Sequence, residues 1–106
     1  MTCPEVVPAC EDLACTEKKL ADEESSKARA RVYTELLFRH WDSWEDGLRS
    51  HIFVAPLVAR EGRPRELGKP VDLMKGQDVD SPTRPFGGDE EIAFAPDGAE
   101  IAYAAR

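Results

Sequence analysis

Residues 38–54 read FRHWDSWEDGLRSHIFV, and this stretch decides the fold class because two strand-like runs flank a turn dipeptide. The runs cover Leu36–Trp44 and Arg49–Leu57, and aromatic, β-branched and leucine residues are frequent in both. Asp46-Gly47 lies between them, and such a dipeptide favours the left-handed backbone of a two-residue hairpin turn. The stretch therefore predicts an antiparallel hairpin.

A two-residue turn at this place also fixes which residues face each other across the hairpin. It puts Asp42 opposite His51 and Trp41 opposite Ile52. We expect Asp42 and His51 to pair, and the tryptophans to pack inside the sheet. Pro56 either ends the second strand or marks it as an edge strand, because proline has no N–H to donate.

A second hairpin is predicted near the end of the chain, where residues 92–103 read IAFAPDGAEIAY. Proline presets the backbone of the second turn residue, and Gly98 supplies a left-handed position. Between the two hairpins, residues 59–90 are rich in proline, glycine and charge. This composition predicts a long loop with one short strand near Arg65–Leu67.

The chain before the first hairpin divides into an irregular cysteine-containing segment, residues 1–15, and an amphipathic helix, residues 16–35. Thr16 is the predicted N-cap of the helix, because its hydroxyl can accept a backbone N–H from the next turn. Helix-favouring alanine, leucine, glutamate, lysine and arginine dominate the residues that follow. The apolar stripe of this helix is thin, so we expect the helix to need a partner surface.

The chain is acidic, with 14 lysine and arginine residues against 21 aspartate and glutamate residues and a net charge of −7. Nucleic-acid binding requires a basic face, so we expect no nucleic-acid partner. No apolar run approaches the roughly 20 residues that cross a bilayer, so we expect no membrane partner either. The first residues lack the features of a signal peptide, and any export signal would lie upstream of Met1.

Three cysteines, Cys3, Cys10 and Cys15, fall within the first fifteen residues. Because their number is odd, at least one thiol stays free or pairs elsewhere. A Cys10–Cys15 disulfide across a short loop and free thiols in a reducing compartment are both compatible with this spacing. The cysteines include no closely spaced pair of the kind that binds zinc, and we expect no metal site and no cofactor.

Four segments together resemble one protein family. Residues 92–103 resemble the Pro-Asp-Gly hairpin of TolB-like β-propellers, and residues 38–54 resemble part of the N-terminal propeller of acylaminoacyl peptidases and dipeptidyl aminopeptidases. Residues 85–89, reading PFGGD, and residues 10–16, which lead into the charged helix, are similar to the same group. The chain is thus similar to the propeller domain of prolyl oligopeptidase family serine peptidases.

The resemblance implies a mainly β fold in which residues 36–106 form a partial β-propeller. This part would hold two antiparallel hairpins, from incomplete blades, preceded by the one N-terminal α-helix. The implied role is that of a scaffold and substrate gate for a C-terminal α/β-hydrolase domain, which these residues do not include. We expect a fragment of such an exopeptidase, or the product of a truncated reading frame, that meets peptide substrates only through the parent enzyme.

No catalytic residue of the family can be assigned to this chain. The nucleophile of such hydrolases lies in a G-x-S-x-G turn, and we expect the chain alone to be inactive because none of its serines has this context. These serines are Ser25, Ser26, Ser43, Ser50 and Ser81. Exported relatives favour a periplasmic or secreted parent, and that setting favours the Cys10–Cys15 disulfide. A chain made without a signal peptide would be cytoplasmic.

Arg39, His40 and Asp42 are the candidate substrate-binding residues, because polar groups that face the cavity of a propeller-capped peptidase can meet a peptide. Strand alternation puts His40 and Asp42 on one face, and Arg39 and Trp41 on the other. The competing interpretation is structural, with Asp42 paired to His51. A His–Asp pair without a nucleophile performs no acyl transfer. The alternative function is a stand-alone TolB-like module that binds a protein partner through its hairpin edges.

Overall fold

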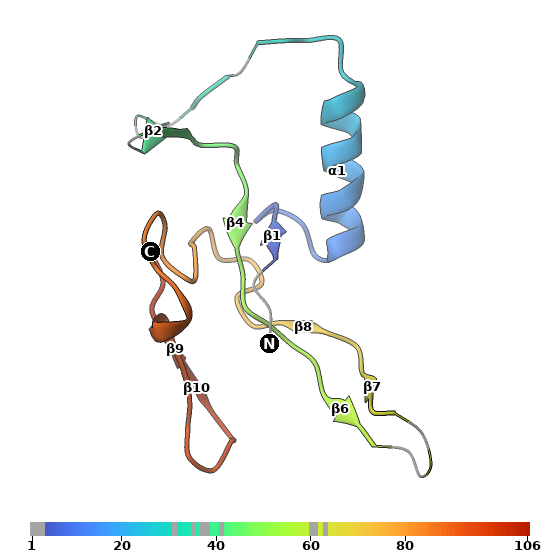
Figure 1. Cartoon of the computed structure of the whole chain (residues 1–106). Coiled ribbons are helices and arrows are strands. Elements are labelled where there is room, and N and C mark those ends of the chain that lie inside the picture. Colours follow the sequence, from blue (N-terminus) through green and yellow to red (C-terminus); the bar gives the residue numbers. More distant parts are fainter. Residues whose placement is uncertain are drawn as a thin grey trace.

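The computed structural model of the chain describes residues 4–30, 32–34, 36, 39–40, 42–59, 62 and 64–106. These residues form one α-helix, one short 3-10 helix and a series of two-stranded antiparallel ribbons (Figure 1). The molecule is elongated, 53 Å along its longest axis and 22 Å along its shortest. The expectation of a mainly β chain with one helix is confirmed, but the ribbons in the described ranges do not join into a common sheet.

The strands are short, and each ribbon is antiparallel. β1 pairs with β4, β2 with β3, β5 with β8, β6 with β7, and β9 with β10. The elements are β1 (Glu5–Val6), α1 (Leu13–Ser25), β2 (Arg39–His40), β3 (Ser43–Trp44), β4 (Arg49–Ser50), β5 (Phe53–Val54), β6 (Leu57–Val58), β7 (Glu66–Leu67), β8 (Val71–Asp72), the 3-10 helix η1 (Asp89–Glu91), β9 (Ile92–Phe94) and β10 (Ile101–Tyr103).

Helix α1 begins three residues earlier than its predicted start. The N-cap is Asp12, whose Oδ1 accepts the backbone N–H of Cys15 at 2.8 Å. Thr16 is not the cap. It lies in the first turns of the helix with its side chain buried, and its Oγ1 accepts the N–H of Val7 at 3.2 Å. The hydroxyl is therefore used to attach the helix to the segment that precedes it.

The helix also ends earlier than predicted, at Ser25 rather than near residue 35. Ser25 Oγ donates to the carbonyl of Asp22, and Ser26 Oγ accepts the N–H of Ala28. Serine side chains that bond to nearby backbone in this way compete with the helical hydrogen bonds, and Ser26 already has an extended backbone.

The chain bends at Gly47 as predicted, but the strands on the two sides of Asp46-Gly47 do not pair with each other, so the predicted hairpin is wrong. Gly47 has a left-handed backbone, with φ of 77°, and Asp46 Oδ1 accepts the N–H of Leu48 at 3.0 Å. The strand after the turn, β4, pairs instead with β1, while β3 before the turn pairs with β2. Trp41, expected to face Ile52, lies outside the described residues.

β5 and β6 form the ribbon's first side, and β7 and β8 pair with them inside the segment predicted as a long loop, where the predicted strand near Arg65–Leu67 is confirmed as β7. Phe53 and Val54 face β8, and after a gap of two residues the strand continues as β6 facing β7. Three residues separate β7 from β8, so the register shifts by one residue, as in a β-bulge. Pro56 lies at this irregularity, where its carbonyl accepts the N–H of Gly68 at 2.8 Å.

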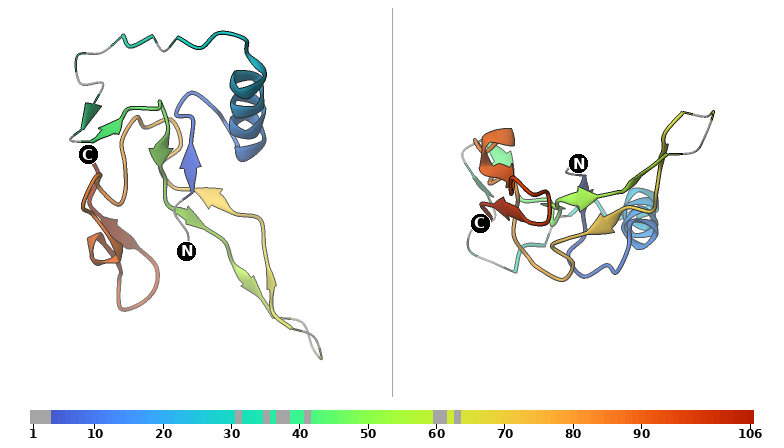
Figure 2. Two further views of the ribbon diagram at one scale, coloured as in Figure 1. Left: turned by 45° about the horizontal axis from the view of Figure 1, so that its top comes forward. Right: turned by 90° about the horizontal axis from the view of Figure 1, so that it is seen from below.

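The second predicted hairpin is confirmed. β9 and β10 pair in register, with Phe94 opposite Ile101 and Ile92 opposite Tyr103, and the hairpin extends from the rest of the molecule (Figure 2). Gly98 has φ of 72° and donates its N–H to the carbonyl of Ala95 at 2.8 Å. Proline and glycine thus act in the turn as the sequence predicted.

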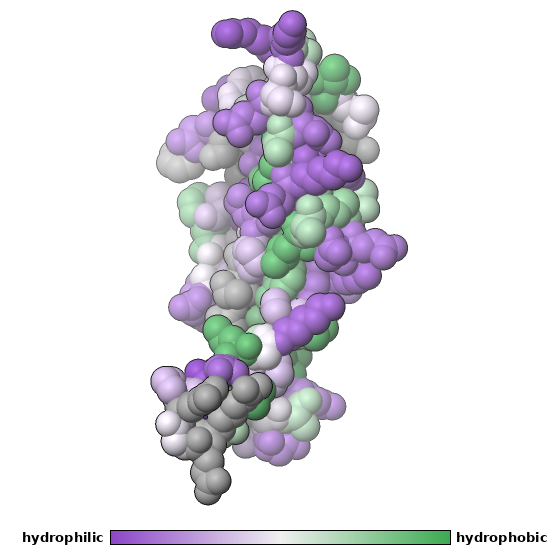
Figure 3. Space-filling model, turned by 90° about the vertical axis from the view of Figure 1, so that its right-hand side faces the viewer, coloured by the Kyte–Doolittle hydropathy of each residue, from purple (hydrophilic) through white to green (hydrophobic). Residues whose placement is uncertain are grey.

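The core is small and lies where β1, β4 and β5 meet the chain after β8. Its buried apolar side chains are Val6, Ile52, Phe53 and Met74. Several apolar side chains are more than half exposed, among them Leu57, Leu67, Phe86 and Phe94. Figure 3 shows apolar side chains lying between charged ones on the surface of one face of the molecule. Among the described residues, no helix has the length and apolar character required to cross a membrane.

Ser81 offers a first prediction about this core. Its Oγ is fully buried and has no hydrogen-bond partner within the described part of the chain. Replacing Ser81 by alanine removes a buried hydroxyl that lost its water on folding, so we expect the free energy of unfolding to rise by about 1 kcal/mol. Urea denaturation measures it, with Ser50→Ala as the serine control. A clear loss of stability in Ser81→Ala would contradict the unpaired state of the hydroxyl.

Candidate functional site

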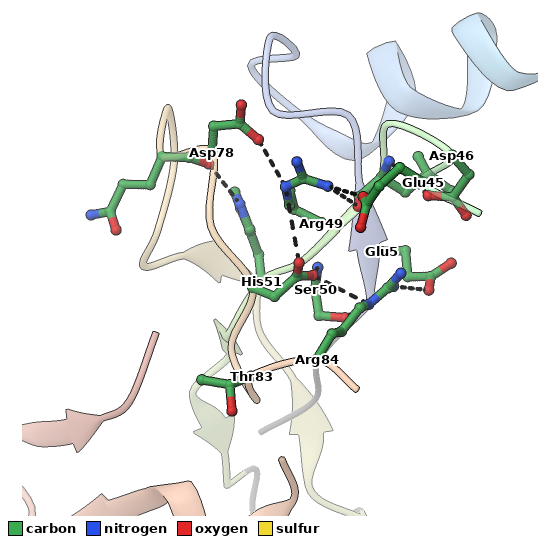
Figure 4. A network of polar contacts seen from close by, with 12 residues as sticks. Glu5, Glu45, Asp46, Arg49, Ser50, His51, Asp78, Thr83 and Arg84 are labelled. Carbon is green, nitrogen blue, oxygen red and sulfur yellow. Dashed lines mark hydrogen bonds and ion pairs between the residues drawn. The ribbon is translucent and has the colours of Figure 1, made fainter. Parts of the chain in front are cut away.

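Asp80 is the centre of a polar network that joins distant parts of the chain. Figure 4 shows other members of this network, among them Arg49, Ser50 and Arg84. Its Oδ1 accepts the backbone N–H of Ser50 at 2.7 Å and lies 3.3 Å from Nε of Arg84. Its Oδ2 lies 3.9 Å from Nε of Arg49. The backbone of Asp80 exchanges two hydrogen bonds with Arg106. We call Glu45, Arg49, Ser50, Asp78, Asp80, Arg84 and Glu5 the Asp80 cluster.

Two arginines carry the positive charge of the Asp80 cluster. Arg49 in β4 contacts Asp78 at 2.8 Å and Glu45 at 3.0 Å. Partial burial acts to lower the pKa of Arg49, but the facing carboxylates of Asp78, Glu45 and Asp80 outweigh it and raise the pKa. Arg84 pairs with Glu5 in β1. Carboxylates outnumber arginines, and the cluster ties β1, β4 and residues 78–84 together.

His51 is buried beside this cluster, and its predicted pairing with Asp42 is wrong. Its Nδ1 lies 2.8 Å from Oδ2 of Asp72, and its Nε2 lies 3.1 Å from the carbonyl of Gln77. Asp72 also accepts the N–H of Met74 at 2.8 Å, which fixes the carboxylate. Both ring nitrogens are thus engaged by fixed acceptors. The imidazole holds residues 72–77 against β4 and β5.

Thr83 and Glu91 close the loop before the second hairpin. The Glu91 carboxylate accepts the backbone N–H of Thr83 at 2.6 Å and its hydroxyl at 2.7 Å. A Cβ atom at Gly87 would lie 2.4 Å from Glu91 Oε2 and 2.5 Å from the backbone of Thr83. Glycine at this position therefore allows the loop to close.

These two hydrogen bonds, that of the backbone N–H first, lower the pKa of Glu91 below its ordinary value of 4.5. Replacing Thr83 by valine removes the hydroxyl and keeps the N–H, so the pKa should rise part of the way back. The stability linked to this carboxylate is present above pH 4.5 and is lost as the pH falls through the lower folded-state pKa. We therefore expect acid unfolding of the variant at a higher pH.

Carbon-detected NMR titration of the Glu91 carboxyl measures this change directly. A Thr83→Ser variant, which retains a hydroxyl, is the matched control and should keep the lowered pKa. An unchanged Glu91 pKa in Thr83→Val would show that the hydroxyl contributes nothing to it.

The candidate substrate-binding residues lie around the β2–β3 ribbon. Arg39 in β2 faces Trp44 in β3, and its guanidinium carbon lies 5.4 Å from the centre of the Trp44 ring. The Tyr33 ring stacks on the same tryptophan at 6.1 Å. Trp44 is 52% exposed, so the expectation that it packs inside a sheet is wrong.

Asp42 and His40 occupy the same ribbon. Asp42 is exposed and lies in the turn between β2 and β3. The prediction that Asp42 and His40 share one face of a single strand is therefore wrong. For His40 the structure describes the backbone, which pairs with Ser43. A role of these residues in binding substrate stays a prediction.

The cysteine segment lies at the start of α1. Cys10 and Cys15 are joined by a disulfide, with their Cα atoms 5.5 Å apart. Cys3 lies outside the described residues. No group of three or more histidine, cysteine, aspartate or glutamate side chains in the described ranges could hold a metal ion.

A groove of about 360 Å³ lies between α1 and the turn of residues 46–48. Val7, Leu20 and Leu48 supply its apolar surface, and Lys19 and Asp22 are among the charged residues that line it. One wall of this groove is therefore helix α1, and the opposite wall is the turn before β4.

Comparison with known proteins indicates what kind of protein contains such a segment. Proteins named dipeptidyl-peptidase 5 match from Porphyromonas endodontalis (38% identical over 90 residues), Porphyromonas gingivalis (39% over 80) and Schizosaccharomyces pombe (34% over 65). The chain resembles a segment of a dipeptidyl peptidase. The matches cover 85%, 76% and 58% of this chain, but only 12%, 11% and 10% of the respective relatives.

The dipeptidyl peptidase similarity rests on the sequence comparison alone. No protein-family model matches the chain. No solved structure matches it either. The matches span about an eighth or less of the length of these curated relatives, as expected for a fragment of a dipeptidyl peptidase.

Proposed function

We propose that this chain is a non-catalytic propeller portion of a serine dipeptidyl peptidase of the prolyl oligopeptidase family. In the parent it would act as scaffold and substrate gate for an α/β-hydrolase domain. The observation that carries this proposal is the 38% identity over 90 residues to a dipeptidyl-peptidase 5 of which the chain spans 12%. This small share of the relative's length supports a structural contribution.

The open ribbons support a propeller portion. Two-stranded ribbons are marginally stable alone, and they gain stability when further strands extend the sheet. Leu57 and Leu67 face each other across the β6–β7 ribbon and are 61% and 76% exposed. In the parent, neighbouring strands outside these residues would cover such side chains.

Within that parent, the Asp80 cluster would be the scaffold and the β2–β3 ribbon would face the substrate. Arg39 and Asp42 are exposed on this ribbon, where polar groups can reach the ends or carbonyls of a short peptide. With His40 they form the proposed substrate-facing set. The Cys10–Cys15 disulfide supports a periplasmic or secreted parent, because disulfides persist in oxidising compartments.

A segment exchange tests the proposal. The part of this chain that matches the Porphyromonas gingivalis dipeptidyl-peptidase 5 over 80 residues replaces the corresponding segment of that protein, and a chromogenic dipeptide substrate reports activity. We expect the chimera to keep activity within about tenfold of the parent and a deletion of the segment to abolish it. In the chimera, Arg39→Ala and Asp42→Ala should raise KM more than they lower kcat, with the exposed Lys75→Ala as control.

The isolated chain supplies the complementary measurement. We expect no turnover of dipeptide substrates and no labelling by a serine-directed fluorophosphonate. Turnover that the fluorophosphonate blocks would overturn the non-catalytic assignment, and an inactive, correctly folded chimera would overturn the peptidase scaffold.

A stand-alone protein-interaction module of TolB-like type is the second candidate. The observation in its favour is the set of exposed apolar residues on the ribbons, since such residues often mark interaction surfaces. Size-exclusion chromatography of the chain distinguishes the two. A monomeric chain favours the module, and a chain that self-associates through its unpaired strand edges favours the peptidase portion.

A further inference from the structure

Helix α1 is attached to the rest of the molecule through its N-terminal end. Thr16, in the first turns, is the buried residue of the helix, and its Oγ1 accepts the N–H of Val7 directly after β1. The Cys10 N–H donates to the carbonyl of Val7 at 2.8 Å, and the disulfide joins Cys10 to Cys15. These three ties lie within ten residues and fix how the helix leaves β1.

The remainder of α1 is exposed. All residues from Glu17 to Ser25 are exposed, and so are residues 26–30 after the helix. Figures 1 and 2 show α1 standing beside β1 and joined to it by the short loop at its base. An exposed helix of 13 residues has little stability of its own, so the ties at its base decide its position.

We propose that the Cys10–Cys15 disulfide is a thiol–disulfide exchange site whose reduction by a dithiol releases α1 from β1. A thiolate of the dithiol attacks Sγ of Cys10, and the S–S electron pair leaves on Sγ of Cys15. The second thiol of the reductant then displaces Sγ of Cys10. The reductant departs as a cyclic disulfide, and the protein gains two electrons and two protons as two thiols. This inference does not depend on the proposed function.

The position of the two cysteines suits this exchange. Both are half-buried rather than enclosed, so a small dithiol can reach the sulfur atoms. Cys15 lies in the first turn of α1, where the positive end of the helix dipole stabilises a leaving thiolate. Only four residues separate the two cysteines, so the open loop is short and the disulfide can re-form.

Release of α1 changes the groove beside it. Leu20 belongs to the helix wall of this groove, and Leu48 belongs to the wall made by the turn before β4. With the disulfide open, only the hydrogen bonds of Val7 with Thr16 and with Cys10 remain of the three ties. The two walls then separate, so the groove exists in the oxidised protein and is lost in the reduced one.

Limited trypsin digestion of the 106-residue chain tests the inference. A Cys3→Ser variant leaves Cys10 and Cys15 as its only cysteines. After treatment with dithiothreitol, alkylation and intact-mass measurement should count two thiols, against none in the oxidised form. Cleavage after Lys18 and Lys19 in α1 should become about tenfold faster on reduction, because cleavage follows the population of the released helix. Cleavage after the exposed Arg65, next to β7 and away from the disulfide loop, should stay unchanged.

The Cys10→Ser, Cys15→Ser double variant is the matched control. It should be cleaved in α1 at the rate of the reduced protein, whether or not dithiothreitol is present. Equal cleavage of α1 in both redox states would overturn the release, and equal acceleration at Arg65 would show general unfolding instead. Failure of dithiothreitol to expose two thiols would overturn the exchange site.

Discussion

Replacing Asp80 by alanine is expected to lower the free energy of unfolding by about 1–3 kcal/mol, because the backbone N–H of Ser50 loses its acceptor and two arginines lose one of their carboxylates. The Asp80 side chain is 12% exposed and holds the backbone of Ser50 and both arginines, Arg49 and Arg84. A chain of this size has a total stability of only about 5–10 kcal/mol, so the variant should be largely unfolded well below the wild-type urea midpoint.

Asp78 provides the control for this experiment. It contacts the same Arg49 at 2.8 Å, but its side chain is 72% exposed. An exposed ion pair contributes roughly 0–1 kcal/mol, so Asp78→Ala should change the urea midpoint little. Asp80→Asn, which keeps an acceptor for the Ser50 N–H, should fall between the two. Similar losses for Asp78→Ala and Asp80→Ala would contradict the central place of Asp80.

The second large effect is expected at His51, where His51→Ala should cost about 3 kcal/mol. The side chain is 1% exposed, so its removal leaves a cavity and also leaves Asp72 and the carbonyl of Gln77 without their partner. Chemical denaturation followed by tryptophan fluorescence measures the loss.

A double-mutant cycle identifies the partner of His51. The cycle of His51→Ala with Asp72→Ala should give a coupling of about 2 kcal/mol, because the two side chains lie in contact. The cycle with Asp42→Ala, the pairing that the sequence predicted, should give a coupling of about zero. Coupling to Asp42 in place of Asp72 would restore the predicted hairpin register and contradict the observed one.

The features that the sequence predicted well depend on neighbours along the chain. The β9–β10 hairpin follows from its turn, since Gly98 supplies the left-handed position and both strands lie next to it. The existence of α1 follows from composition, but its start was misplaced because Asp12 and Thr16 are both acceptable N-caps. Local hydrogen bonds of Ser25 and Ser26 decided its end, and composition does not reveal them.

The features that the sequence did not predict depend on partners far away in the chain. Two strand-like runs beside Asp46-Gly47 favoured a local hairpin, but β4 pairs with the distant strand β1 instead. The bulge opposite Pro56 and the pairing of His51 with Asp72 also depend on residues far away in the sequence. The Asp-Val-Asp run at residues 78–80 gave a weak signal for the Asp80 cluster, because alternate residues of an extended segment share one face.

The pairing of β1 with β4 has a consequence for biosynthesis. Glu5 and Val6 leave the ribosome well before their partner strand, which is complete only once Ser50 has been translated. The ion-pair partner of Glu5, Arg84, emerges later still. The nascent β1 must therefore remain free of other pairings until β4 has been made, a period in which chaperones protect such segments.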